Sequence, residues 1–327
     1  MTDTLDDTAG PAAGRQAEPV GADSAPSYEV VLVTYHSHAQ VAGLLDALGP
    51  TVPVAVVDNA SGADGVPALV AGRAGTRCLD GENVGFARAA NLGARSSTAD
   101  YLVFVNPDTR PTSAVLESLV ADLAADPTLG SVAAATTGAD GRIELGVGGW
   151  EPTPRRALVY AFGLHRRWPR AGVVARPQVG EEIELGWITG ACLAVRRETF
   201  LRLGGFDERY FVYNEDMAFG RAVREAGLRQ RLRTDLLVRH ATSSSGPRET
   251  ARRGAQLPKM PQQKGASMAS YLVDHNGPVV ATFMRAVLMA GFLPRLGVAV
   301  LRRDRDARRH HLAYLKGQAT RRSPYRS

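Results

Sequence analysis

The chain has 327 residues, of which 44% are hydrophobic and 22% are charged, with a formal net charge of +6. This length allows one large domain or two modest ones, and the composition is that of a globular protein with ample apolar residues for a core. Cys78 and Cys192 are the only cysteines, and no CxxC or Cys/His spacing accompanies them. Neither a disulfide framework nor a zinc site is indicated, and a reducing cytoplasm fits best.

The two ends of the chain carry opposite charge. Residues 1–27 hold five acids and one Arg, with no basic segment leading into an apolar run, so we predict a disordered tail and no signal peptide. Residues 300–327 hold nine Lys or Arg and two Asp. Such a basic end is a solvated tail, a nucleic-acid patch or a membrane-surface patch; because interleaved aromatic residues are missing, we favour membrane over nucleic acid.

Short apolar runs alternate with helix-period segments in the first half of the chain. The runs at 29–34, 54–58 and 101–106 are typical of buried parallel strands. Apolar residues at helical spacing follow the first and third runs. These are Val41, Leu44, Leu45, Leu48, Val115, Leu116, Leu119, Val120 and Leu123. The order predicts an α/β fold with a doubly wound, mostly parallel, Rossmann-like sheet.

Polar residues follow each predicted strand directly. They are Thr34-Tyr35, Asp58-Asn59 and Asn106-Pro107-Asp108. Since ligands of such sheets bind outside the carboxyl ends of the strands, we expect these clusters to meet at one edge. The sequence contains no G-x-G-x-x-G after the first strand and no P-loop, which disfavours a dinucleotide site and a P-loop nucleotide site.

Two segments suggest nucleotide binding. Asp58 can accept the imino hydrogen of a pyrimidine base, although a strand-end Asx turn is the plainer interpretation. Asn83, Gly85 and Asn91 lie at a predicted helix start, where glycine lets a phosphate or ribose approach the backbone.

Asp108 and His240 are candidate metal ligands. A hard divalent ion that bridges a diphosphate needs carboxylate oxygen, and Asp108 follows the rigid Pro107, although Asn-Pro-Asp is also good turn chemistry. His240 ends the apolar run LLVRH, before Ser243 to Ser245, where a structural histidine is the commoner case.

Glu215-Asp216 begins a helical pattern after the glycine turn at 204–207. The pair can hold a catalytic base or simply cap the helix, since acids in a first turn oppose the helix dipole. Between these regions, residues 138–185 are rich in Gly, Arg, Trp and Pro, and we interpret them as an excursion near the site.

An apolar stretch occupies residues 279–301. It is long enough to span a bilayer, but Arg285 and Arg295 interrupt it and Pro294 would kink it. Arg285, Arg295 and Arg302 fall within about a third of the helix circumference. This pattern favours a helix lying in the membrane interface over one that crosses it, while packing on the protein is an equal alternative.

Several motifs, in this order, resemble bacterial family 2 glycosyltransferases of the GT-A fold. They are VVLVTY, VVDNASG, NVGFARAANLG, YLVFVNPDT, WITGACLAVRRETFLRLGGFDERYFVYNED and VRHATSSS. The resemblance covers roughly residues 28–245, and its closest subgroup is the rhamnosyltransferases that act on polyprenyl-diphosphate-linked acceptors.

The resemblance implies a role for each matching residue. Asp58 would bind the pyrimidine beside Thr34 and Tyr35, and Asp216 would be the general base next to Glu215. The DxD-type metal motif would read Asn106-Pro107-Asp108, with an amide in place of one acid, and His240 would add a metal ligand. The acceptor side would be lined by Trp187, Thr189, Gly190 and Ala191.

The implied reaction is inverting sugar transfer with Mg²⁺ or Mn²⁺. We expect L-rhamnose from dTDP-L-rhamnose to reach a lipid-linked saccharide of the cell envelope, with UDP-galactofuranose or UDP-N-acetylhexosamine as alternative donors. A non-catalytic nucleotide-sugar-binding protein and a nucleotidyltransferase are the rival functions. The expected organisation is a tail at 1–27, a GT-A domain at 28–250 and a basic helical extension at 251–327. The enzyme would be cytoplasmic, with the extension on the inner membrane face.

Overall fold

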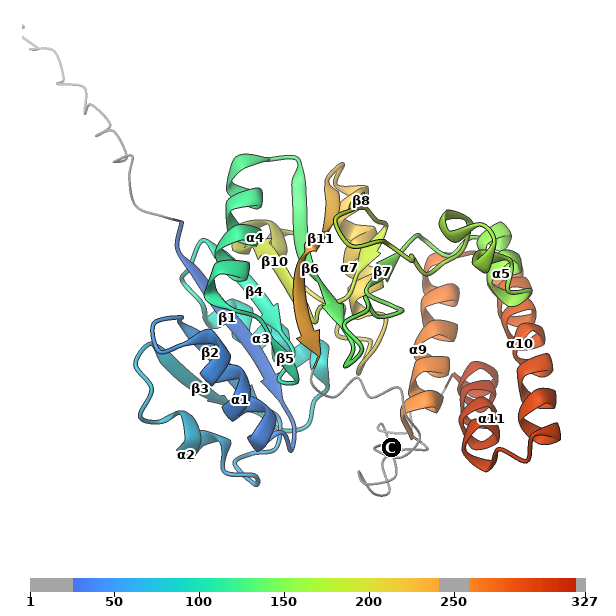
Figure 1. Ribbon diagram of the computed structural model, residues 1–327, viewed down its shortest axis with the longest axis horizontal. Coiled ribbons are helices and arrows are strands. Elements are labelled where there is room, and N and C mark those ends of the chain that lie inside the picture. The colour runs from blue at the N-terminus through green and yellow to red at the C-terminus, as the bar shows by residue number, and fades with distance from the viewer. Residues whose placement is uncertain (1–25, 241–258, 322–327) are drawn as a thin grey trace, which may run out of the picture.

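Within the part of the chain that the computed structural model describes, residues 26–240 and 259–321, nine strands form one central sheet (Figure 1). The order is β3-β2-β1-β4-β10-β6-β11-β5, and β8 pairs with β11. The strands are β1 (Tyr28–Thr34), β2 (Val54–Asp58), β3 (Thr76–Asp80), β4 (Tyr101–Val105), β5 (Thr109–Arg110), β6 (Leu129–Thr137), β8 (Glu182–Glu184), β10 (Cys192–Arg196) and β11 (Arg229–His240). Most of the predicted tail and the serines at 243–245 lie outside the described residues.

The three strands predicted from apolar runs are neighbours in the sheet. β1 pairs in parallel with β2 and with β4, so their carboxyl ends meet at one edge. β10 is antiparallel to both β4 and β6, and β11 runs parallel to β6. The sheet is therefore mixed but mostly parallel, and β11 ends at the same edge as β1, β2 and β4.

Helices cover both faces of the sheet, which confirms the doubly wound α/β prediction. Because successive strand residues point to opposite faces, Val30 and Leu32 pack with α1, α2 and α4, whereas Val31 and Val33 pack with α3, α6 and α7. These helices are α1 (His38–Leu48), α2 (Val66–Val70), α3 (Phe86–Ser96), α4 (Ser113–Ala125), α6 (Arg197–Arg202) and α7 (Glu215–Glu225).

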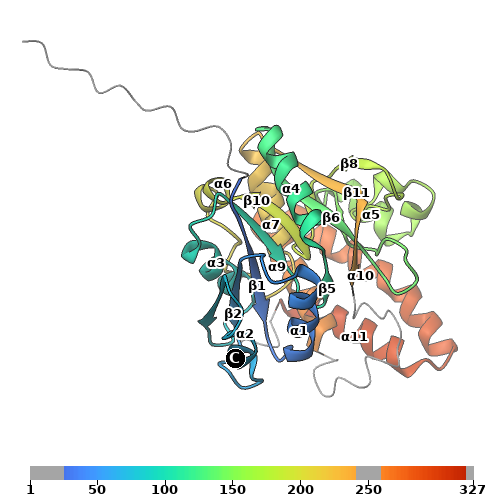
Figure 2. The ribbon, with the colours of Figure 1, turned by 60° about the vertical axis from the view of Figure 1, so that its left-hand side comes forward.

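The segment predicted as an excursion joins β6 to β10. It contains α5 (Pro154–Ala161), the 3₁₀ turns η1 (Leu164–Arg166) and η2 (Pro169–Ala171), and β7 (Gly148–Gly149), which pairs with β9 (Trp187–Ile188) outside the main sheet. In Figures 1 and 2 it reaches away from the sheet toward the C-terminal helices.

Three C-terminal helices pack beside the sheet domain: α9 (Lys259–His275), α10 (Pro278–Leu301) and α11 (Arg305–Thr320). A third apolar cluster joins Tyr271 of α9 and Met284 of α10 to Trp187 and to Met217 of α7. The helical extension is thus built onto the element that carries Glu215-Asp216.

The arginines of α10 face the protein. Arg285 donates to the carbonyls of Gln318 and Ala319 at the end of α11, and Arg295 lies 5.4 Å from the Tyr160 ring centroid. The face of α10 that carries these arginines therefore packs on the protein, which is one of the two interpretations that the sequence left open for this helix. By length and composition α10 could cross a membrane. Its apolar 18-residue stretch has a mean hydropathy of 1.6, and 28% of that stretch is buried in the protein.

Candidate active site

The ends of β1 and β2 form the first part of the site. Thr34 pairs with Asp58, and both residues are buried, whereas Tyr35 is 39% exposed. The backbone N–H of Ala60 donates to Asp58 Oδ1 at 2.9 Å, and that of Gly62 donates to Oδ2 at 2.7 Å. The Asx-type turn is therefore present, and it fixes the carboxylate at the edge of the sheet.

Only glycine fits at position 85, because its φ is positive and the backbone of Phe211 packs directly against it. Its φ is +91°, and a Cβ added there would lie 2.4 Å from the carbonyl oxygen of Phe211. Phe86 N–H donates to that same oxygen at 2.7 Å, and Asn59 Nδ2 donates to the Gly85 carbonyl at 3.3 Å. The close approach that we predicted for a phosphate or ribose is made instead by the loop that leads to Glu215. The neighbouring Asn83 is exposed.

Asn91 is a buried structural residue. Its Oδ1 accepts from the N–H of Phe206 at 2.9 Å, and its Nδ2 donates to the carbonyl of Phe206 at 2.8 Å and to Glu208 at 3.1 Å. These bonds hold α3 to the glycine turn at 204–207. These bonds support a packing role for the Asn91 amide, and its predicted contact with a nucleotide stays a prediction.

Asp108 and His240 lie together, although 132 positions separate them in the sequence. His240 Nε2 is 3.0 Å from Asp108 Oδ1, and Nδ1 is 2.7 Å from Glu144 Oε2. Burial lowers the pKa of His240, but its hydrogen bonds with Asp108 and Glu144 and their charges outweigh burial and raise the pKa to about 9. Glu144 was not expected, since it lies in the excursion with no motif around it.

This cluster fits a divalent cation bound by two protein ligands. With the ring singly protonated, Nδ1–H donates to Glu144 and Nε2 faces Asp108, which is the carboxylate–histidine–metal pattern of many sites. A cation bound here would therefore displace the proton that the raised pKa keeps on Nε2. Glu144 adjoins the opposite nitrogen, so it orients the ring. Among the described residues, no three or more His, Cys, Asp or Glu side chains are placed so that they could hold one metal ion together. The remaining ligands would have to be oxygen atoms of a bound phosphate-containing molecule or of water.

Glu215 and Asp216 begin α7 after two residues in left-handed conformation. Tyr213 has φ +69° and Asn214 has φ +72°, neither of them glycine, which is backbone strain of the kind found at functional sites. Asp216 Oδ1 accepts from the Met217 N–H at 2.8 Å, so part of the predicted capping is present. Glu215 is 7% exposed, and its Oε2 makes no hydrogen bond within the described chain.

The two carboxyl groups differ in acidity. Burial raises the pKa of Glu215, and the charge of Asp216 raises it further, well above the usual range. Burial also raises the pKa of Asp216, to about 6, although the hydrogen bond from Met217 and the charge of Lys264 lower it. Of the two, Glu215 is therefore the member that favours its protonated form, whereas Asp216, with a pKa of about 6, is mostly ionised at neutral pH.

Helix α9 of the extension supports this pair. Ser267 Oγ donates to the carbonyl of Val212 at 2.9 Å, and the Lys264 ammonium lies 4.8 Å from the Tyr213 ring centroid. The extension thus supplies both a brace for the strained loop and a positive charge near Asp216. Lys264 was missed from the sequence because it lies 48 positions away, outside every motif.

The predicted acceptor residues lie in β9 and in the link between β9 and β10. Trp187 is 7% exposed, and its Nε1 makes no hydrogen bond with any residue that the structure describes. The carbonyl of Ala191 accepts from the Asn106 N–H at 3.0 Å, which ties this segment to the end of β4. Thr189 is partly exposed and Gly190 is buried.

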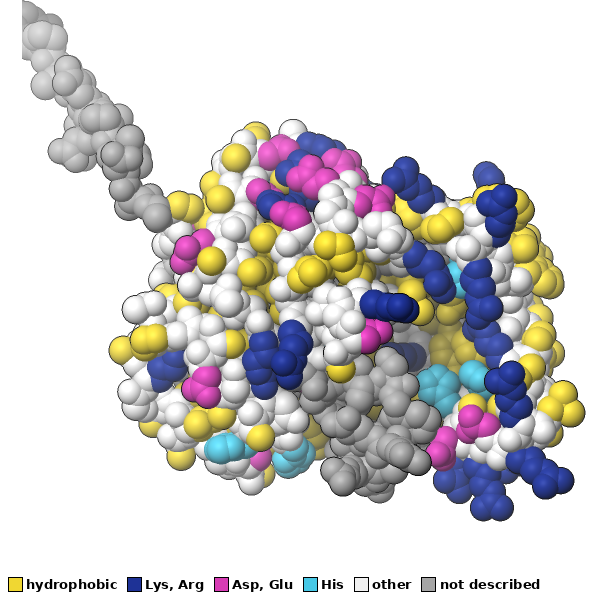
Figure 3. All heavy atoms as spheres, in the orientation of Figure 1, with side chains coloured by type: hydrophobic (Ala, Val, Ile, Leu, Met, Phe, Trp, Pro, Cys, Tyr) yellow, Lys and Arg dark blue, Asp and Glu magenta, His cyan; other side chains and the backbone are white. Residues whose placement is uncertain are grey.

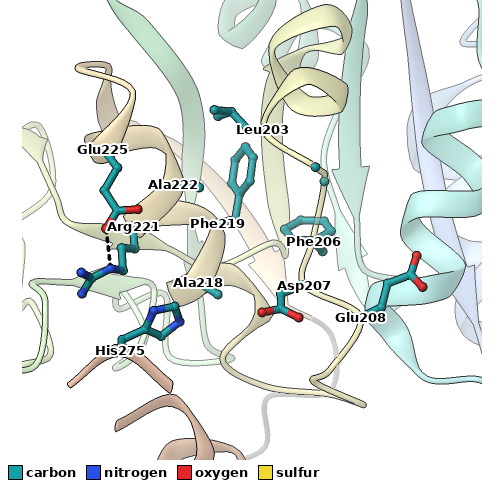
Figure 4. Close-up of a pocket in the computed structure, with 12 residues that line it drawn as sticks. Leu203, Phe206, Asp207, Glu208, Ala218, Phe219, Arg221, Ala222, Glu225 and His275 are labelled. Carbon is teal, nitrogen blue, oxygen red and sulfur yellow. Dashed lines mark hydrogen bonds and ion pairs between the residues drawn. The ribbon is translucent and has the colours of Figure 1, made fainter. Parts of the chain in front are cut away.

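A separate cavity of about 380 Å³ lies between α7, the glycine turn and the end of α9 (Figure 4). Arg221 and Glu225 on its wall pair at 2.7 Å, and Asp207 pairs with Arg209 at 2.6 Å. None of the predicted site residues lines this cavity. We assign it no part in the site.

Comparison with known proteins decides the family. The profile of "Glycosyl transferase family 2" matches residues 30–167. The N-acetylglucosaminyl-diphospho-decaprenol L-rhamnosyltransferase of Mycobacterium tuberculosis (strain CDC 1551 / Oshkosh) is 31% identical over 218 residues, which cover 61% of this chain and 70% of that protein. The chain belongs to glycosyltransferase family 2. An O-antigen biosynthesis protein of Myxococcus xanthus is 29% identical over 148 residues, 42% of this chain and 11% of its own length.

Solved structures show the same fold as this glycosyltransferase. The mannosyltransferase of Pyrobaculum calidifontis, solved with GDP-Man and Mn²⁺, aligns with a TM-score of 0.56 at 20% identity, over 90% of this chain and 86% of that one. The structure of GalNAc-T7 with UDP, GalNAc and Mn²⁺ aligns with a TM-score of 0.50 at 13% identity, over 86% of this chain and 58% of that one. The predicted GT-A architecture is thereby confirmed.

Proposed function

We propose that this glycosyltransferase moves L-rhamnose from dTDP-L-rhamnose to a saccharide linked to a polyprenyl diphosphate, with inversion at the anomeric carbon. The observation that carries this proposal is the pair Glu215-Asp216, in which burial raises both pKa values, the charge of Asp216 raises that of Glu215 further, and Asp216 stays mostly ionised at neutral pH. The sugar and the lipid-linked acceptor are suggested by the mycobacterial relative, whose name specifies both.

The donor site that we propose lies at the ends of β1 and β2. Asp58, held by two backbone amides, would accept the imino hydrogen of the base, and the exposed ring of Tyr35 would lie beside it. Thymine and uracil present the same imino group, so a UDP-sugar is the alternative donor. We leave Gly85 and Asn91 out of this site because both serve to pack the chain.

The metal site that we propose is Asp108 with His240, oriented by Glu144. A bound Mg²⁺ or Mn²⁺ would neutralise charge that grows on the departing diphosphate. Asn106 replaces one acid of the usual motif, so the chain offers few anionic ligands here. The affinity for the metal ion would therefore depend on the oxygen atoms of the bound nucleotide-sugar donor. Metal and donor are therefore expected to bind together.

In the proposed reaction Asp216 accepts the proton of the acceptor hydroxyl. That oxygen attacks the anomeric carbon, the bond to the nucleoside diphosphate breaks on the opposite face, and the electron pair leaves with the diphosphate. An alcohol is far less acidic than a carboxylic acid, so the proton moves as the new bond forms. A base with a pKa of about 6 is stronger than an ordinary aspartate and still ionised at neutral pH. One base suffices, which fits inversion.

Thermal unfolding with a panel of dTDP- and UDP-sugars, with and without Mg²⁺, tests the donor and metal assignments. A ligand at 100 times its dissociation constant adds about 2.7 kcal/mol of stability. We expect dTDP-L-rhamnose with Mg²⁺ to stabilise the protein most, and Asp108→Asn to remove the metal-dependent part. Asp306→Asn, at an exposed carboxylate of α11, is the matched control. Greater stabilisation by a UDP-sugar would reassign the donor, and no stabilisation by any nucleotide sugar would overturn the proposal.

A further inference from the structure

Residues 152–180 carry a cluster of positive charge that sugar transfer leaves unexplained. The segment contains six arginines and no acid. The two glutamates that flank it are paired: Glu151 bonds to Arg221 and Arg224, and Glu181 bonds to Arg170 at 2.9 Å. Most of this positive charge is therefore not neutralised by the protein itself.

Four of these arginines line an open cavity of about 930 Å³. Arg156 is committed to the protein, since its Nη1 donates to the carbonyls of Arg170 and Gly172. Burial is the main cause that lowers the pKa of Arg156, and the positive charge of the neighbouring Arg155 lowers it further. Arg155 and Arg167 are exposed, and their guanidinium groups make no hydrogen bond or ion pair with the described residues. These two guanidinium groups are available to an anion from outside.

Large apolar side chains are exposed on the same segment. Phe162 is 72% exposed and Trp168 is 54% exposed. Trp168 also lines the arginine cavity, so an aromatic ring and cationic groups share one edge. Tryptophan is enriched at the level of the lipid headgroups, and basic residues are attracted to anionic lipids.

Helix α10 continues this surface. Its only charged residues, Arg285 and Arg295, face the protein, so its outward face is apolar along 24 residues, about 36 Å at 1.5 Å per residue. The exposed members include Val279, Phe283, Leu293, Val298 and Leu301. Arg302 and Arg303 follow directly at its end.

The two parts adjoin. α5 packs against α10 so closely that a Cβ on Gly291 would lie 2.6 Å from Ala161 Cα. Figure 3 shows basic side chains over this side of the molecule, with hydrophobic side chains along its outer edge. We call the exposed arginines and aromatic residues of 152–180, with the outward face of α10, the basic apolar surface.

We propose that the basic apolar surface docks on an anionic phospholipid membrane. Arg155 and Arg167 would contact lipid phosphates, which the guanidinium fork matches well, while Phe162 and Trp168 enter the headgroup layer. α10 would lie in the membrane plane, because its other face is held in the core by residues such as Met284 and Leu288. A helix that crossed the bilayer would have to leave these contacts. An apolar face of this length is also rare on a monomer surface without a partner.

Flotation with vesicles tests this docking and requires neither donor nor acceptor, so its result is independent of the proposed reaction. The intact chain should bind phosphatidylcholine vesicles containing phosphatidylglycerol far better than phosphatidylcholine alone. Each arginine near an anionic surface strengthens binding about fivefold, so the double variant Arg155→Ala/Arg167→Ala should bind about 30-fold more weakly. The matched pair Arg95→Ala/Arg202→Ala, on α3 and α6, removes the same charge and should have little effect.

A second variant separates the apolar contribution from the charge. Phe162→Asp should weaken vesicle binding, whereas Leu92→Asp, at an exposed leucine of α3, should not. Equal losses in the test and control variants would overturn the proposal, because binding would then follow net charge alone. It would also be overturned if the intact chain ignored both vesicle types and formed a dimer that Phe283→Asp dissociates, since a second copy would then cover α10.

Discussion

Replacing Asp216 with Asn should lower activity and raise stability together. The amide keeps the size of the side chain and an oxygen that can accept from the Met217 N–H, so the helix start is preserved. It removes the proposed base. General base catalysis contributes about 10²- to 10⁴-fold to rate, so kcat should fall by that factor while donor affinity is kept.

The stability change follows from the acidity of the buried carboxyl. Its pKa rises from 3.8 to about 6 on folding, so the native state holds a proton that the unfolded chain has lost. Stability therefore falls as pH rises from 3.8 to 6 and stays lower above that range, by up to about 3 kcal/mol. Asp216→Asn lacks this loss, so its advantage should be absent at acid pH and largest above pH 6.

The assay is nucleoside diphosphate release at saturating donor, together with urea unfolding at several pH values. Glu215→Gln is the internal comparison, because burial and the charge of Asp216 favour the neutral form of Glu215, so its replacement should keep most activity. Retained turnover in Asp216→Asn, or a collapse in Glu215→Gln alone, would refute the assignment of the base. A variant that lost activity and stability together would show that Asp216 is needed for folding and that our pKa argument is wrong.

Two further changes test neighbouring parts of the site. Lys264→Met should raise the pKa of Asp216, since the positive charge lowers it, and so move the acidic limb of the pH–rate profile to higher pH; an unmoved limb would contradict the contact. Gly85→Ala should destabilise the fold by about 2 kcal/mol or more in urea unfolding, because the added Cβ meets Phe211 in addition to an unfavourable φ. Gly227→Ala is the control, because φ is +74° there but no atom lies within 4 Å of the added Cβ. In this variant only the unfavourable φ should destabilise the fold.

The sheet edge could be predicted because its signals are local. The apolar runs that became β1, β2 and β4 each end in polar residues, and parallel pairing brings such ends together without any knowledge of tertiary contacts. The start of α7 at Glu215 was also visible, from the change of period after the glycine turn.

Other parts of the site depend on contacts between distant segments. Glu144 meets His240 from the excursion, and Lys264 reaches Asp216 from α9. Asn91 looked like a ligand in its motif, yet its partner Phe206 lies 115 positions away. No periodicity or spacing reports such pairs, because they arise only when the chain is packed. The orientation of Arg285 toward the protein could not be predicted for the same reason, because its hydrogen-bond partner is a carbonyl at the end of α11.

Product analysis of a single reaction tests the central claim most directly. The purified enzyme is incubated with dTDP-L-rhamnose, Mg²⁺ and a polyprenyl-diphosphate-linked N-acetylglucosamine, and the nucleotide and the glycosylated lipid are quantified. We predict one free dTDP for each sugar transferred, with the new linkage of opposite anomeric configuration to the donor. Release of pyrophosphate, retention of configuration, or donor binding without transfer to any lipid-linked saccharide would contradict the account.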